Sequence, residues 1–239
     1  MSAHDHRSHR GHAAGVAGAA ALAGYMLPGA AAAWPTLRRP LGIEDRTASG
    51  TGYALTFDDG PHPQGTPRVL EVLAQENVTA TFFLVGERVQ ADPGLARELT
   101  AAGHHIGLHC QRHRNLLRLG PRQTRADIEM AYDVITEHCG RPPSVYRPPY
   151  GILNASAMWL ASSRGWRILL WSHWGRDWEA GATPSSIASR VTDGAGPGAM
   201  LLLHDGDHYS APGSWRSTVA ALPRVLEVLA ERGLDPVAP

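Results

Sequence analysis

Two adjacent carboxylates, Asp58 and Asp59, close an apolar stretch of the chain and precede the pair Gly60-Pro61. Unpaired carboxylates this close repel each other, so keeping both charged requires a cation, a positive side chain, or a proton on one of them. A metal ligand beside a general base is one arrangement that meets this demand. The pair therefore indicates a site for acid–base and metal chemistry.

Two histidines, His109 and His113, lie about fifty residues downstream of this pair. Their i, i+4 spacing predicts that both imidazoles lie on one face of a helical turn. Two histidines with one carboxylate and an open position form a usual catalytic zinc set. The chain contains 13 histidines, so this spacing also arises by chance. The hypothesis of a metal site depends on the two carboxylates lying beside it.

The segment Arg147-Pro148-Pro149-Tyr150-Gly151 is expected to be rigid and extended, because each proline fixes its own φ and restricts the residue before it. Such a segment can aim Arg147 into a site and offer the Tyr150 N–H to an oxyanion. The alternative is an ordinary proline loop with a surface arginine.

His204 ends the apolar run 199–204 and is interpreted either as a general acid or as a core histidine with satisfied hydrogen bonds. Asp177 and Trp178 are candidates to tune this histidine and to wall a small pocket. Trp171 and Trp174 are expected to pack.

The elements that must position these residues alternate along the chain. The sequence predicts strands over residues 53–57, 80–85, 105–109, 144–147, 167–171 and 199–204. It predicts helices over residues 67–75, 95–102, 122–138, 154–163, 184–192 and 218–231. This alternation predicts an α/β fold with a mainly parallel sheet, closed as a barrel rather than left open. Every polar cluster above follows an apolar run, as expected at the carboxyl ends of barrel strands.

The chain has 239 residues, enough for one domain of barrel size, with residues 51–239 as the catalytic domain. Its 22 basic and 22 acidic residues give no net charge, so neither nucleic acid nor an anionic membrane is an expected partner. Its two cysteines, Cys110 and Cys139, support neither a zinc ribbon nor a disulfide-rich scaffold.

Residues 1–50 are interpreted as an N-terminal tail. Its tip carries four histidines, and residues 13–34 carry no charge, which is enough length for a signal peptide or an anchor. Because that run is mainly alanine and glycine, any membrane association through it is expected to be weak. A solvated tail is the alternative, and so is metal binding at His4, His6, His9 and His12.

Taken together, the motifs resemble those of the polysaccharide deacetylase family, also called the NodB-homology family or carbohydrate esterase family four. The resemblance covers about residues 52–233 and rests on T-F-D-D-G-P, H-x-x-x-H, R-P-P-Y-G, D-W and L-x-H in the family order. It implies a single-domain, distorted (β/α) barrel of about seven strands. It also implies removal of acetyl groups from N-acetylated sugars with one divalent metal, for which Zn2+ is expected and Co2+ and Ni2+ are the alternatives.

The resemblance also assigns roles. Asp58 would be the general base, held by Arg147, and His204 would be the general acid, supported by Asp177. The metal would be bound by Asp59, His109 and His113. Tyr150 would offer its N–H to the oxyanion, and Trp178 and Leu202 would line the pocket for the acetyl methyl group.

Three departures from the family pattern stand out. Cys110 replaces a serine or threonine, which would remove a supporting hydrogen bond or introduce an oxidisable group. Trp174 replaces the first aspartate of a D-x-x-D-W motif near the sugar-binding rim. The polar and aromatic loop 204–215 matches no known subsite but is placed to contact substrate.

The function expected is N-deacetylation of an amino-sugar glycan by a monomeric, secreted or cell-envelope enzyme, with a cytoplasmic location as the alternative. Two other functions stay open. One is hydrolysis of a small or lipid-linked amide or formamide on the same scaffold, and the other is glycan binding without turnover.

Overall fold

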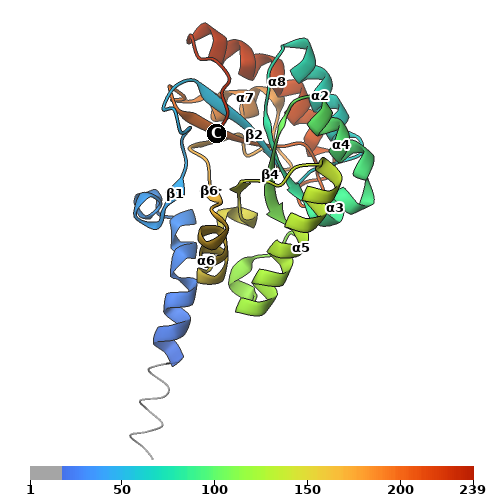
Figure 1. The fold of residues 1–239 in the computed structure, drawn as a ribbon. Helices are drawn as coiled ribbons and strands as arrows, with labels where there is room; N and C mark the ends of the chain where they lie inside the picture. The colour runs from blue at the N-terminus through green and yellow to red at the C-terminus, as the bar shows by residue number, and fades with distance from the viewer. Residues whose placement is uncertain (1–17) are drawn as a thin grey trace, which may run out of the picture.

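A computed structural model of the protein describes residues 18–239. The predicted histidine-rich tip, His4, His6, His9 and His12, lies outside these residues. The described part is an α/β fold built around one curved parallel sheet, with helices packed against its outer face (Figure 1). The predicted distorted barrel is confirmed, with eight strands in place of about seven.

The sheet has the strand order β1-β6-β5-β4-β3-β2-β8-β7, and all of its neighbouring strands pair in parallel. The strands are β1 (Ile43–Glu44), β2 (Tyr53–Asp58), β3 (Thr81–Val85), β4 (His105–Cys110), β5 (Val145–Tyr146), β6 (Arg167–Leu169), β7 (His173–Trp174) and β8 (Ala199–His204). The longest strands, β2, β4 and β8, end on Asp58, Cys110 and His204. Their carboxyl ends therefore carry the acidic and histidine residues that the sequence singled out.

The barrel is distorted because its last strands do not form one continuous pairing. β6 pairs with β5 and β1, whereas β7, three residues further on, pairs with β8 at the opposite edge of the sheet. The segment 170–172 thus crosses the seam of the barrel. The predicted strand 167–171 is shorter for this reason, since the backbone turns away after Leu169.

The helices cover the outside of the sheet and match the predicted ones, with shifts of up to four residues at their ends. They are α2 (Gly65–Gln75), α3 (Gly86–Ala91), α4 (Pro93–Ala101), α5 (Pro121–Cys139), α6 (Ala155–Arg164), α7 (Pro184–Thr192) and α8 (Ser214–Glu231). The short helix α3 was not predicted. It follows β3 directly and has only two buried residues, so it lacks a long apolar stripe.

Alternation along the strands separates the packing core from the site. In β2, Tyr53, Leu55 and Phe57 belong to the main apolar core, and Phe57 stacks on Phe82 with ring centroids 5.0 Å apart. The intervening residues Thr56 and Asp58 point to the opposite face of the strand, since successive side chains alternate. The period of two therefore places polar chemistry inside the barrel while the outer face binds the helices.

Part of the predicted N-terminal tail packs against the domain. Short 3-10 helices at Leu27–Ala32, Pro35–Leu37 and Arg39–Leu41 lead into β1. Arg38 is buried and donates to the carbonyl of Trp171 at 2.8 Å and to Asp45 at 2.8 Å. This segment is thereby fastened to the seam of the barrel.

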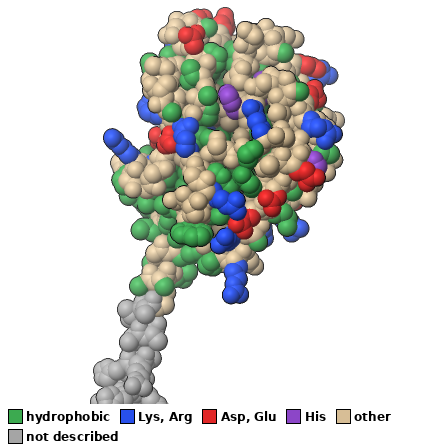
Figure 2. Space-filling view, viewed as in Figure 1, with side chains coloured by type: hydrophobic (Ala, Val, Ile, Leu, Met, Phe, Trp, Pro, Cys, Tyr) green, Lys and Arg blue, Asp and Glu red, His purple; other side chains and the backbone are tan. Residues whose placement is uncertain are grey.

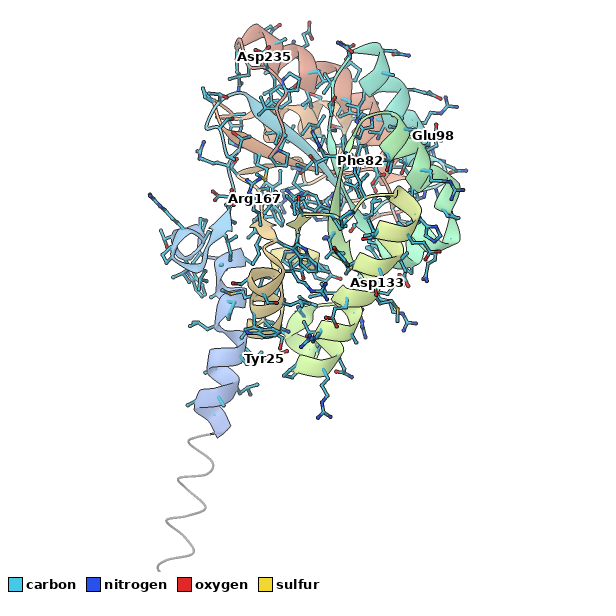
Figure 3. All side chains as sticks on the ribbon, viewed as in Figure 1. Tyr25, Phe82, Glu98, Asp133, Arg167 and Asp235 are labelled. Atoms are coloured by element: carbon cyan, nitrogen blue, oxygen red, sulfur yellow. The ribbon has the colours of Figure 1, made fainter. Side chains whose placement is uncertain are left out.

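Residues 18–26 form a helix at one end of the domain. Tyr25 of this helix extends toward the segment that precedes α5, where its hydroxyl donates to the carbonyl of Leu119 at 2.9 Å (Figure 3). None of the helices in the described residues has the length and apolar character needed to cross a membrane. On the face shown in Figure 2, acidic and basic side chains are interspersed, in keeping with the balanced charge of the chain.

Candidate active site and metal centre

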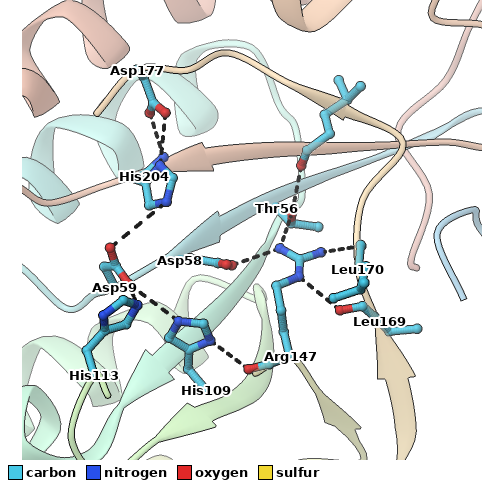
Figure 4. A network of polar contacts seen from close by, with 11 residues as sticks. Thr56, Asp58, Asp59, His109, His113, Arg147, Leu169, Leu170, Asp177 and His204 are labelled. Carbon is cyan, nitrogen blue, oxygen red and sulfur yellow. Dashed lines mark hydrogen bonds and ion pairs between the residues drawn. The ribbon is translucent and has the colours of Figure 1, made fainter. Parts of the chain in front are cut away.

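All ten residues predicted for the site come together at the carboxyl ends of the strands. Eight of them line a cavity of about 240 Å3, and Arg147 and Asp177 lie directly behind it (Figure 4). The cavity residues are Asp58, Asp59, His109, His113, Tyr150, Trp171, Trp174, Trp178, Leu202, His204, Tyr209 and Ser210. Residues from five strand ends thus share one small space, which is the usual location of a barrel active site.

Arg147 is the largest fully buried side chain, and its guanidinium organises the floor of the cavity. It donates to Asp58 at 2.8 Å and to the Thr56 hydroxyl at 2.7 Å. Two further N–H groups donate to the carbonyls of Leu169 and Leu170 at 3.1 and 3.0 Å. The guanidinium also lies over the ring of Phe83, 4.0 Å from its centroid. Asp58 is therefore a buried carboxylate with a fixed positive partner, and one of its oxygens remains free to face the cavity.

The second carboxylate, Asp59, faces two histidines. Its Oδ1 atom lies 3.4 Å from His109 Nε2 and 3.3 Å from His113 Nε2, and one ligand atom from each residue lies within 4.8 Å of the other two. Among the described residues, this buried Oδ1 has no hydrogen-bond partner. Burial alone would raise the pKa of Asp59, but the contacts with His109, His204 and His113 hold that pKa well below its usual range. An ionised oxygen without a proton donor, aimed between two imidazoles, fits a divalent cation.

Both histidines present a ring nitrogen in the form that a metal requires. His109 Nδ1–H donates to the backbone carbonyl of Arg147 at 2.7 Å, which leaves the Nε2 lone pair directed at Asp59. Burial lowers the pKa of His113 to about 4 against the opposing charge of Asp59, so its imidazole is neutral at pH 7. The donor set of two imidazoles and one carboxylate leaves open positions for water and substrate.

The two histidines do not share a helical turn, which corrects the prediction made from their i, i+4 spacing. His109 belongs to β4, whereas His113 lies in the irregular segment that follows Cys110. The chain bends there because the Gln111 N–H donates to Asp127 on α5 at 3.0 Å. The bend, and not helical periodicity, brings the two imidazoles to one point.

His113 is held by aromatic rings rather than by a hydrogen bond. Its Nδ1 atom has no partner among the described residues. Tyr209 stacks on the imidazole with centroids 4.4 Å apart, and Tyr150 meets it edge-on at 4.5 Å. Tyr209 is anchored in turn, since its hydroxyl donates to Glu87 at 2.7 Å and accepts from Arg88 at 3.3 Å. The loop after His204 therefore orients a metal ligand and lines the cavity.

His204 and Asp177 form a second buried pair. His204 Nδ1 lies 2.9 Å from Asp177 Oδ1, and the other oxygen of Asp177 accepts from the His204 N–H and from Thr218. Burial alone would lower the pKa of His204, but Asp177 and the carboxylates Asp59 and Asp58 outweigh it and raise that pKa to about 10. The Nε2 atom lies 3.9 Å from Asp59 Oδ2. A protonated imidazole therefore lines the cavity, which suits a general acid and differs from the surroundings of a plain core histidine.

Two residues of the site have left-handed backbone conformations. Asp59 has φ 77° and Tyr150 has φ 60°. Such conformations cost a residue other than glycine about 1–3 kcal/mol, and they persist where the surrounding structure fixes them. At Asp59 the conformation separates its side chain from that of its neighbour Asp58, so that the two carboxylates reach different partners.

Several cavity residues were not predicted. Trp171 and Trp174 were expected to pack, but both line the cavity, and Trp174 is 44% exposed at its mouth. Trp174, Trp178 and His204 form a row with ring centroids 5.4 Å apart at each step. Of the unpredicted residues, Tyr209 and Ser210 belong to the loop 204–215, whose polar and aromatic composition was the available signal.

The thiol of Cys110 is shielded from solvent. It is fully buried in β4, and burial, reinforced by Asp127 and Asp59, raises the pKa of its thiol well above the usual value. The thiolate is the reactive form, so the thiol is inert at neutral pH. This residue is compatible with an intact site.

Comparisons with known proteins agree with this fold and with the family that the motifs resemble. A family model described as polysaccharide deacetylase matches residues 45–169. A peptidoglycan-N-acetylglucosamine deacetylase of Bacillus cereus is 38% identical over 183 residues, covering 75% of this chain and 82% of that protein. A chitooligosaccharide deacetylase of Bradyrhizobium is 37% identical over 198 residues, covering 78% of this chain and 89% of that protein.

A solved structure of similar fold is that of a peptidoglycan N-acetylglucosamine deacetylase bound to an N-hydroxybenzamide compound. It superposes with a TM-score of 0.75 at 30% identity, covering 82% of this chain and 89% of that one. The chain belongs to the polysaccharide deacetylase family.

Proposed function

We propose that the protein is a metal-dependent hydrolase that removes N-acetyl groups from amino-sugar-containing glycans. The observation that carries this proposal is the buried Asp59 Oδ1, which has no hydrogen-bond partner among the described residues and lies between the imidazoles of His109 and His113, directly beside a carboxylate fixed by Arg147. Membership of the polysaccharide deacetylase family supports the same chemistry.

Asp59, His109 and His113 would hold the cation. Two nitrogen donors and one oxygen donor favour Zn2+, and Co2+ and Ni2+ accept the same set. When bound, such a cation polarises the amide carbonyl and acidifies water.

The chain supplies the proton transfers. Asp58, kept in place by Arg147, would take a proton from the attacking water as its oxygen bonds to the carbonyl carbon. The Tyr150 N–H would donate to the oxygen on which negative charge develops. His204 would give its proton to the amide nitrogen as the carbon–nitrogen bond breaks, so that the products are acetate and an amine. Trp178 and Leu202 would enclose the acetyl methyl group.

Release of acetate from the N-acetylated substrates of a panel, and of formate from its formamides, tests this function. The panel contains chitin oligomers, peptide-free peptidoglycan fragments and small formamides, each assayed with and without a chelator. We expect acetate from the glycans, loss of activity with the chelator, and recovery with added Zn2+. Activity confined to the formamides would replace the glycan assignment with that of a small-amide hydrolase. Glycan binding without turnover, even with metal added, would identify a non-catalytic member.

The substrate points to the cell envelope or the exterior as the site of action. One of the similar proteins named above is a peptidoglycan deacetylase, and peptidoglycan is the glycan of the bacterial cell wall. Sequencing the N-terminus of the protein purified from its native host, with fractionation of the cells, tests this location. Full-length protein in the cytoplasmic fraction would contradict it.

Replacing Asp177 with asparagine is expected to narrow the pH range of activity. The charge of Asp177 helps raise the pKa of His204, so its removal lowers that pKa and the imidazole loses its proton at lower pH. The alkaline limb of the kcat profile should then move to lower pH, and kcat at pH 8 should fall about tenfold or more. This effect persists with metal bound, because a cation neutralises Asp59 and not Asp177.

The matched control for that change is Asp133→Asn, which makes the same substitution at an exposed position of α5. It should leave the pH profile unchanged. An Asp177→Asn profile that coincides with the wild-type profile would contradict the role of His204 as the acid.

A further inference from the structure

A second hollow adjoins the reaction cavity. It has a volume of about 560 Å3 and is lined by His113, Arg114, Asn115, Arg118, Leu119, Tyr150 and Ile152. Two of these residues, His113 and Tyr150, also line the reaction cavity. The two spaces therefore meet at the metal ligand and at the backbone that would bind the oxyanion, which is where a neighbouring sugar of a glycan chain must leave the site.

The lining of this groove combines apolar surface with positive charge. Tyr150 is 55% exposed and offers an aromatic ring, and Leu119 and Ile152 provide apolar surface. The groove has no acidic lining residue. By contrast, the reaction cavity is lined by both Asp58 and Asp59. The two spaces therefore differ in their acidic lining residues.

The two arginines of the groove differ in their partners. Arg114 donates to the buried Asp127 at 2.5 Å, and Asp127 also accepts from the Gln111 N–H. The Nε of Arg114 has no partner among the described residues. Arg118 is exposed and has no side-chain hydrogen bond or ion pair within residues 18–239. Burial, together with Asp59 and Cys110, raises the pKa of Tyr150, and the charge of Arg118 opposes that rise. Arg118 and Tyr150 line the same groove.

The wall that carries Arg118 is held in place. The Leu116 carbonyl accepts from Asn154 at 2.8 Å, and the Leu119 carbonyl accepts from Tyr25 at 2.9 Å. Asn115 accepts from the Leu117 N–H and begins the 3-10 turn Leu116–Arg118. A charged group on such a fixed turn loses little conformational freedom in its backbone when it binds a ligand.

We propose that this groove is a subsite for a sugar that bears a carboxylate, next to the N-acetylated sugar in the reaction cavity, and that Arg118 binds this carboxylate. The ring of Tyr150 packs against the apolar face of the sugar. A planar guanidinium matches a carboxylate in geometry, and an arginine without an acidic partner is available for it. This proposal rests on the proposed N-deacetylase function and adds to it a preference for acidic glycans.

The test compares an oligosaccharide of alternating N-acetylated and carboxylate-bearing sugars with its neutral methyl ester. The wild-type protein should show about three- to fivefold higher kcat/KM on the acid, the effect of one exposed charge pair. Arg118→Gln should remove that preference through KM, leave kcat unchanged, and leave activity on neutral chitin oligomers unchanged. Arg122→Gln, at an exposed position near the start of α5, should behave as the wild type.

The outcomes separate this proposal from the function on which it rests. Equal kcat/KM for acid and ester, with normal turnover of chitin oligomers, overturns the subsite and leaves the deacetylase function standing. If no substrate releases acetate, calorimetric titration with the deacetylated acid and its ester decides the subsite alone. Tighter binding of the acid to wild type than to Arg118→Gln supports the subsite, and equal binding overturns it.

Discussion

Asp58→Asn is expected to lower kcat by about 100- to 10,000-fold while the protein keeps its metal, because an amide cannot take the proton of the attacking water. In the wild type, Arg147 donates to Asp58 at 2.8 Å. The amide oxygen of asparagine can still accept this hydrogen bond, so the fold should be retained. Acetate release and the metal content of the purified variant measure the two effects. Asp133→Asn serves again as the control for the chemical change.

Asp58→Asn is also expected to lower the free energy of unfolding, because it removes the negative partner of the buried Arg147. Leaving Arg147 without an ionised partner destabilises a protein by about 3–5 kcal/mol, so thermal unfolding should be recorded with the kinetics. If Asp58→Asn does not fold, the more conservative Asp58→Glu, which keeps the charge and moves the carboxylate, tests the same base. Wild-type turnover in a folded Asp58→Asn protein would disprove the assignment of Asp58.

His109→Ala is expected to abolish stoichiometric metal binding and, with it, turnover. The change removes one of three ligands and also breaks the contact that fixes its ring to the Arg147 carbonyl. Loss of an outer partner of a metal ligand already costs about 10- to 100-fold in affinity, so loss of the ligand itself should exceed that. Elemental analysis after dialysis, together with acetate release, measures both effects.

The control for this change is His105→Ala, which alters an exposed histidine at the other end of the same strand. It should retain one metal per chain and normal turnover. His113→Ala should resemble His109→Ala. If either variant at the cluster kept wild-type metal content, the cation would have to lie elsewhere.

The fold could be predicted from the sequence to the extent that apolar runs are long. β2, β4 and β8 lie within one residue of their predicted bounds, because a buried strand with helices on its outer side reads as a continuous apolar run. Three strands have only two residues, β1, β5 and β7, and of these β1 and β7 were not predicted because two residues cannot show a period. Their pairing depends on where the seam of the barrel falls, which is a property of the closed sheet.

The site was predictable where chemistry demands particular residue types. Adjacent carboxylates, spaced histidines and an arginine before two prolines have few other uses at strand ends, and the structure brings them together. The bend after Cys110 was not predictable, because it depends on a hydrogen bond to Asp127, sixteen positions further on. The stacking of Tyr209 on His113 was likewise hidden, since it joins two loops that are distant in the sequence.

Arg147 links catalytic competence to the completion of the fold. The guanidinium that holds Asp58 also binds the carbonyls of Leu169 and Leu170, where the chain leaves β6 to cross the seam of the barrel. Its own carbonyl, at the same time, orients His109. A chain whose seam is still open would therefore lack the contacts that fix the side chains of Asp58 and His109. The geometry of the candidate site thus depends on closure of the barrel.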